Sequence, residues 1–152
     1  MGWISNQELT AFPDDLKQIA ERVTSLNFSN NLLTTLPSWM GRFTRLRRLD
    51  LSHNRLTTFT PLDQLTSLKE IYINNNHLTT LPAEIGNLVN LQHLMIDNNH
   101  LTVLPTSIGN LSRLKGLSVN GNQLTAFPEE IGKLGNLTHL LVADNLLTVF
   151  PN

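Results

Sequence analysis

Pairs of aliphatic residues separated by one position recur along the chain. They are Leu49/Leu51, Ile71/Ile73, Leu94/Ile96, Leu117/Val119 and Leu140/Val142. Alternation with a period of two is typical of a short β-strand that buries one of its faces. The pattern therefore predicts a series of short strands, each with an apolar face that other parts of the chain must cover.

These strands belong to a repeat that aligns on an asparagine. The copies begin at Val23, Leu46, Leu68, Leu91, Leu114 and Leu137; complete copies have 22 or 23 residues and the last one is truncated. A strand of this length cannot bury its face alone, so successive copies must stack. Roughly 15 to 20 residues between strands are enough for the crossover that parallel pairing requires. Upstream, residues 7–22 align with half a repeat that lacks a strand.

A second motif, LPxxIG, lies between the strands. Its proline stands where a short helical turn could begin, and acidic residues follow where the dipole of such a turn favours them. These acidic residues are Asp14, Asp15, Glu84, Glu129 and Glu130. The second copy reads FTPLDQLTS and is one residue short. We expect a local change of curvature there and no change of fold.

The full pattern, LxxLxLxxNxLxxLPxxIGxLxx, resembles the leucine-rich repeat family in its 23-residue form, from about Leu9 to Pro151. The resemblance implies an α/β fold, a right-handed horseshoe-shaped solenoid with a parallel sheet on its concave side. Short helical, 3-10 or extended segments would form the convex side. We expect residues 1–22 to be an N-terminal half-repeat cap and residues 23–152 to be six repeats. The resemblance also implies a non-enzymatic module for protein–protein interaction.

Composition narrows the classes of function. The chain has 152 residues, no cysteine and a net charge of −1. Disulfides, cysteine-based zinc sites and a thiol nucleophile are therefore absent, and bulk charge favours neither nucleic acid nor an anionic membrane. Neither a membrane-length apolar run nor a secretory signal pattern is present. We expect a cytoplasmic protein or one secreted without such a signal.

Two recurring polar columns are predicted to serve the fold. One asparagine per copy lies beside inward-facing leucines, and a buried amide is tolerated there only when it is hydrogen-bonded. In leucine-rich repeats this column bonds the backbone, so we expect a structural ladder of Asn31, Asn54, Asn76, Asn99, Asn122 and Asn145. A threonine also recurs once per copy, and we assign it no catalytic role. His77 and His100 could offer two nitrogens to a metal, but they lack a third ligand, so we predict no metal site, no cofactor and no catalytic constellation.

Partner recognition should depend on strand positions that packing leaves free. The outward columns hold Tyr72 and Met95 on adjacent copies, with Glu70 beside them and Gly116 and Ser118 on the next strand. Tyrosine, methionine and arginine are enriched at interface centres. The predicted partner-binding residues are Arg48, Asp50, Tyr72, His93, Met95, Asp97, His139 and Leu141. A simpler alternative is that Arg48 pairs with Glu70 or Asp50 and only keeps the sheet hydrated.

Other features leave alternatives open. The basic run of Arg42, Arg45, Arg47, Arg48 and Arg55 is interpreted as a solvated surface, not as a phosphate or RNA site. Ile4, Leu9, Phe12, Leu16 and Ile19, with help from Trp3, should close the N-terminal end. The last strand is an unpaired edge, so the chain could self-associate as an assembly protein or belong to a longer parent chain. A secreted bacterial effector or a fragment of a signalling scaffold is a further alternative.

Overall fold

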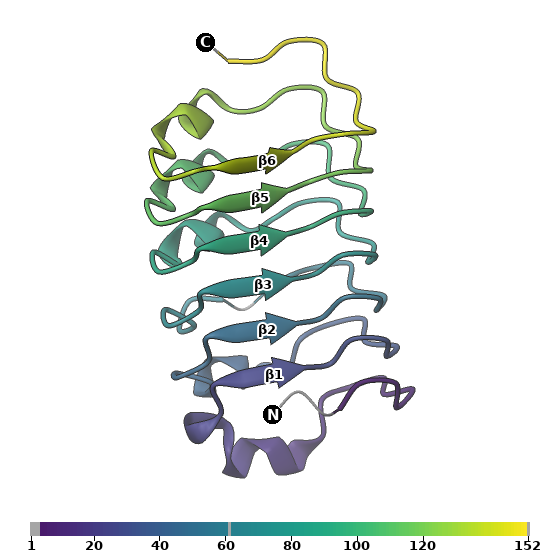
Figure 1. Cartoon of the computed structure of the whole chain (residues 1–152). Coiled ribbons are helices and arrows are strands. Elements are labelled where there is room, and N and C mark those ends of the chain that lie inside the picture. Colours follow the sequence, from purple (N-terminus) through teal and green to yellow (C-terminus); the bar gives the residue numbers. More distant parts are fainter. Residues whose placement is uncertain (1–3, 61, 152) are drawn as a thin grey trace.

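The computed structural model describes residues 4–60 and 62–151, and these form a single coil of stacked repeats. Its strands form one six-stranded parallel sheet in sequence order. They are β1 (Ser25–Asn27), β2 (Arg48–Asp50), β3 (Glu70–Tyr72), β4 (His93–Met95), β5 (Gly116–Ser118) and β6 (His139–Leu141). In Figure 1 the chain rises from β1 to β6 and returns behind the sheet once per copy, as a right-handed crossover. The predicted α/β solenoid is confirmed.

The core lies between the sheet and the returning segments. The middle residue of each strand from β1 to β5 points inward and is buried, as is the aliphatic residue two positions later in β2 to β5. At the N-terminal end the core is aromatic: the rings of Phe12 and Phe28 stack at 4.1 Å between centroids, and Phe43 meets Phe12 edge-on at 6.4 Å. The alternating pattern in the sequence thus corresponds directly to the interior of the coil.

The returning segments carry short 3-10 helices. These are η1 (Asp14–Gln18), η2 (Ala20–Arg22), η3 (Met40–Arg42), η4 (Ala83–Asn87), η5 (Thr106–Asn110) and η6 (Glu129–Lys133). The helices η1, η4, η5 and η6 each begin directly after a proline, whose fixed φ leads into the turn. In the shorter second copy, residues 62–69 form turns without a helix, although Leu62 and Leu65 still fill the core.

Each copy leaves its strand through a residue in the left-handed conformation. Asn30, His53, Asn75, Asn98 and Asp144 have φ between 55° and 58°, and Gly121 has φ of 66°. Asn, Asp, His and Gly are the residue types that tolerate this region best. This column was not predicted from the sequence, although its residue types were a visible signal. It turns the backbone so that the next residue, the ladder asparagine, points inward.

The ladder asparagines hydrogen-bond the backbone of their own copy and of the preceding one. In the second copy, the Asn54 amide donates to the carbonyl oxygens of Phe28 at 2.9 Å and Leu51 at 3.1 Å. Its side-chain oxygen accepts from the backbone N–H of Leu33 at 3.0 Å. Equivalent bonds are made by Asn76, Asn99, Asn122 and Asn145. These bonds satisfy groups that would otherwise be buried without partners.

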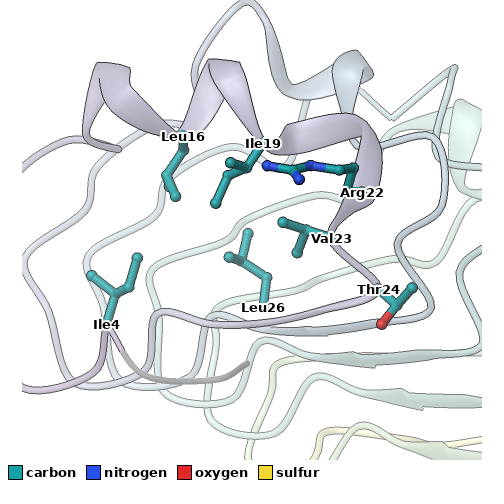
Figure 2. A pocket seen from close by; sticks show the side chains of 7 residues that line it. All are labelled: Ile4, Leu16, Ile19, Arg22, Val23, Thr24 and Leu26. Carbon is teal, nitrogen blue, oxygen red and sulfur yellow. The ribbon is translucent and has the colours of Figure 1, made fainter.

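The two ends of the coil differ. At the N-terminal end, Phe12 and Leu16 are buried and Ile4, Leu9 and Ile19 pack against the core. Trp3 lies outside the described residues. A cavity of about 470 Å³ remains between the apolar side chains of Ile4, Leu16, Ile19, Val23 and Leu26, with Arg22 and Thr24 completing its lining (Figure 2). At the other end Leu141, Leu146, Val149 and Phe150 are each more than half exposed.

Candidate functional site

The face of the sheet that points away from the core, here called the strand face, carries all the predicted partner-binding residues. Strand register makes Tyr72 the direct neighbour of Met95, and Glu70 the neighbour of both Arg48 and His93. Six of the predicted residues therefore lie together, five on β2 to β4 and Asp97 two residues after β4. His139 and Leu141 lie on β6, beyond β5.

The structure corrects the expectation that β5 also contributes free side chains. Gly116 and Ser118 are both buried. A Cβ at Gly116 would lie 3.0 Å from Nδ1 of His93 and 3.4 Å from Cε of Met95. The side chains of His93 and Met95 therefore lean across β5 and cover the glycine. We call Tyr72, His93 and Met95 the central patch; all three are partly exposed.

Arg48, Glu70 and Tyr72 form one cluster beside this patch. The guanidinium of Arg48 donates to Oε2 of Glu70, and the hydroxyl of Tyr72 donates to the same oxygen at 3.1 Å. The Arg48 guanidinium carbon also lies 4.4 Å from the centroid of the Tyr72 ring. Arg48 thus pairs with Glu70, as the simpler alternative anticipated, and it also fixes the orientation of the aromatic ring.

Burial and hydrogen bonding act in opposite directions on Arg48. Partial burial lowers the pKa of Arg48, but its interactions with Glu70 and Tyr72 raise that pKa by more, so the net shift is upward. Arg48 therefore stays cationic at any pH at which binding would be measured. Because its side chain is 46% exposed and that of Glu70 34%, the ion pair itself contributes only about 0–1 kcal/mol to stability.

A second polar ladder, which was not predicted from the sequence, follows the strands on this face. The side-chain oxygen of Asn74 accepts from the backbone N–H of Asp97 at 2.7 Å, and Asp97 accepts from that of Asn120 at 2.8 Å. Asn120 accepts in turn from Ala143. Asp97 also accepts from the hydroxyl of Ser118 at 2.5 Å. Asp97, a predicted partner-binding residue, therefore already accepts two hydrogen bonds within the protein, both at Oδ1.

The histidines offer limited chemistry. The rings of His77 and His100 stack in adjacent turns at 5.8 Å between centroids with an interplanar angle of 5°. Within residues 4–60 and 62–151, no group of three or more His, Cys, Asp or Glu residues is placed to hold a metal ion. In the same residues no helix is both long and apolar enough to cross a bilayer.

Comparison with known proteins agrees with this architecture. A family model described as a leucine-rich repeat region matches residues 17–148. Podocan-like protein 1 of Homo sapiens is 38% identical over 85 residues, which are 53% of this chain and 16% of that protein. The chain thus spans about a sixth of the length of this curated relative.

Two solved plant structures are similar to most of the chain. The peptide hormone receptor RGFR1, in complex with RGF2, has a TM-score of 0.75 and 40% sequence identity over 84% of this chain and 22% of its own. The ectodomain of the Arabidopsis thaliana membrane receptor kinase GASSHO1/SCHENGEN3, in complex with CASPARIAN STRIP INTEGRITY FACTOR 2, has a TM-score of 0.79 and 31% identity over 90% of this chain and 17% of its own.

Proposed function

This chain belongs to the leucine-rich repeat family, and on that premise we propose that it is a non-enzymatic module that binds a protein partner on its strand face. One observation carries the proposal. Tyr72 and Met95 are register neighbours on adjacent strands, remain partly exposed and have the charged residues Arg48, Asp50 and Glu70 on the β2 and β3 side. An aromatic and thioether centre with a polar rim is the usual composition of a protein interface.

The cluster geometry supports a prepared binding surface. The Tyr72 ring is held by Arg48 and Glu70, and Met95 rests over Gly116, so both anchors lose little side-chain freedom on binding. In this proposal Arg48, Asp50, His93 and Asp97 orient the partner, with Asp97 acting from its place in the polar ladder. His139 and Leu141 extend the contact to β6.

The two solved relatives support a peptide or protein as the bound partner. Both are plant receptors in complex with a second component, and one of these receptors is a peptide hormone receptor. One is the ectodomain of a membrane receptor, so an extracellular setting is the better supported of the two predicted locations. The partner of this chain is proposed from its own surface and from these relatives together.

The test compares three immobilised proteins in the capture of partners from native lysate. They are the wild type, the double variant Tyr72→Ala/Met95→Ala and the control Val89→Ala/Val103→Ala, whose valines are exposed but lie outside the strands. The affinity of the captured protein is then measured by interferometry. We expect the first double variant to lose at least about tenfold in affinity, because truncating an interface anchor costs about 1–2 kcal/mol or more.

The control should bind like the wild type, and both double variants should melt within a few degrees of it. Equal binding by the Tyr72/Met95 variant and the wild type would reject the strand face as the site.

A second candidate function, self-association through the edge of β6, is favoured by the exposed Leu141, Leu146, Val149 and Phe150. Sedimentation of the same three proteins tests it: association that rises with concentration and is unchanged in both variants would support this second function.

A further inference from the structure

Charge is distributed unevenly over the sheet, although the net charge of the chain is only −1. Most of the basic residues either begin a strand or precede it by at most three positions. They are Arg22, Arg45, Arg47, Arg48, Lys69, Arg113 and Lys115. Glu70 is the one acidic residue in these positions, and it is already paired with Arg48. The strands therefore begin at a cationic edge of the sheet.

Backbone hydrogen bonds place three of these cations in a line across neighbouring strands. We call these residues, Arg47, Lys69 and Lys115, the basic row. The N–H of Lys69 donates to the carbonyl of Arg47 at 2.8 Å. The N–H of Gln92 donates to Lys69, and that of Lys115 to Gln92, both also at 2.8 Å. With roughly 4.8 Å between neighbouring strands, the row extends over about 14 Å along the solenoid axis.

The basic row has no internal counter-charge among the residues that the structure describes. Their side chains make only two ion pairs within 4.0 Å, Lys17 with Asp14 and Arg48 with Glu70. Arg47, Lys69 and Lys115 are all exposed. Like charges held this close repel one another, and an anionic ligand relieves that repulsion.

The opposite ends of the strands carry the opposite charge. Asp50 ends β2, Asp97 lies two residues after β4, and Asp144 lies three residues after β6. An anionic ligand wide enough to extend from the start of the strands to their ends would contact both the basic row and these carboxylates, and the carboxylates would repel it. A narrow extended chain can follow the basic row alone, with the central patch beside it.

From this arrangement we propose that the basic row binds an acidic segment of a protein partner, about five residues long, that lies along the solenoid axis in an extended conformation. The inference rests on the proposed function and specifies the chemistry of the partner. From the first to the last Cα, five extended residues span about 14 Å, which matches the length of the row, with side chains on one side about 7 Å apart. A protein fits better than nucleic acid because Arg48 covers one face of Tyr72, the aromatic ring that would stack on a base.

The test uses a fluorescein-labelled nine-residue peptide in which glutamate alternates with serine, and a matched peptide with glutamine in place of glutamate. Anisotropy titrations are made at about 0.05 M salt, where screening still permits attraction along the row. The variant Lys69→Gln/Lys115→Gln is compared with Arg55→Gln/Lys133→Gln. The second variant makes the same change in net charge at exposed positions outside the row.

We expect the wild type to bind the glutamate peptide and not the glutamine peptide. The row variant should bind at least about fivefold more weakly, and the control variant should stay within about twofold of the wild type, because the attraction is local. Absence of binding by the wild type, equal binding of both peptides, or equal losses in the two variants would each overturn the proposal. The proposal would also be overturned if a 12-base-pair DNA duplex displaced the labelled peptide at a lower total concentration of negative charge than the unlabelled glutamate peptide requires.

A further variant separates this proposal from the strand-face function. Tyr72→Ala/Met95→Ala leaves the basic row intact, so it should still bind the glutamate peptide as the wild type does. The strand-face function is rejected if the Tyr72→Ala/Met95→Ala variant captures the partner as the wild type does. The basic row is still supported in that case if Lys69→Gln/Lys115→Gln loses binding of the glutamate peptide. If both variants bind the peptide normally, the basic row is not the site.

Discussion

At the scale of single residues, position in the repeat decides what a side chain does. Asn98 and Asn99 are adjacent, yet Asn98 turns the backbone with φ of 56° while Asn99 is buried and binds the backbone. Asn99 accepts from the N–H of Leu78 at 3.0 Å and donates to the carbonyl of Ile73 at 2.9 Å. The same residue type thus solves a conformational problem at one position and a hydrogen-bonding problem at the next.

The importance of the inner asparagines can be measured against the one at the edge. Asn99→Ala should lower the free energy of unfolding by about 2–3 kcal/mol, because it leaves the buried Leu78 N–H unpaired and leaves the Ile73 carbonyl with only its longer bond from Asn76. Asn145 makes equivalent bonds but is only partly buried, so Asn145→Ala should cost about 1 kcal/mol or less. Urea denaturation of both variants checks the difference. Equal losses would show that water does not replace the bonds at the edge.

At the scale of elements, the 3-10 helices pack closely through glycine. A Cβ at Gly86 would lie 2.7 Å from the carbonyl oxygen of Ser107, and one at Gly109 would lie 2.7 Å from that of Glu130. A Cβ at Gly132 would meet nothing within 4 Å. The glycine of LPxxIG, which lacks a Cβ, therefore permits close packing against the following copy and is not required by its own helix.

This contrast predicts opposite effects for the same substitution. Gly109→Ala should destabilise the protein by about 1–3 kcal/mol, because η6 must move away from η5. Gly132→Ala should be neutral or stabilise by up to about 1 kcal/mol, since alanine restricts the unfolded chain and meets no neighbour. Thermal and urea unfolding of the two variants measure both effects. Comparable losses would mean that glycine is required by the helix geometry itself.

At the scale of the whole molecule, each copy touches mainly the copies on either side. The extensive contacts between elements join adjacent strands or adjacent helices, such as β4 with β5 and η5 with η6. Stability in such an array is approximately a sum over copies and their interfaces. The length of the coil can therefore change in whole copies without disturbing the rest.

Deletion of residues 91–113 removes one complete copy and keeps the register of its neighbours. This variant should remain folded, with a lower free energy of unfolding and a smaller denaturant m-value, because less surface is buried. Deletion of residues 91–110 leaves three extra residues in one turn of the coil, and we expect it to unfold or to lose cooperativity. Circular dichroism and urea titration check both. A folded, cooperative 91–110 variant would contradict the requirement for register.

The sequence alone determined the repeat, the α/β solenoid and the core, and it also predicted that Tyr72 and Met95 are neighbours. It could do so because copies of nearly constant length place equivalent residues side by side, so an alignment of the copies already predicts contacts across the sheet. The period of two then separates inward from outward side chains. These properties depend on spacing along the chain, which can be read directly.

Only the tertiary structure decided how the outward side chains are used. Arg48 lies over Tyr72, His93 and Met95 cover Gly116, and Asp97 is committed to Ser118 and Asn120. Each of these depends on side-chain rotamers and on which atoms from two copies meet, and spacing does not specify them. The alignment of Arg47, Lys69 and Lys115 follows from the copies themselves, but the lack of an ion-pair partner for them among the described residues emerged only from the structure. Charge pairing is a matter of distance and not of order along the chain.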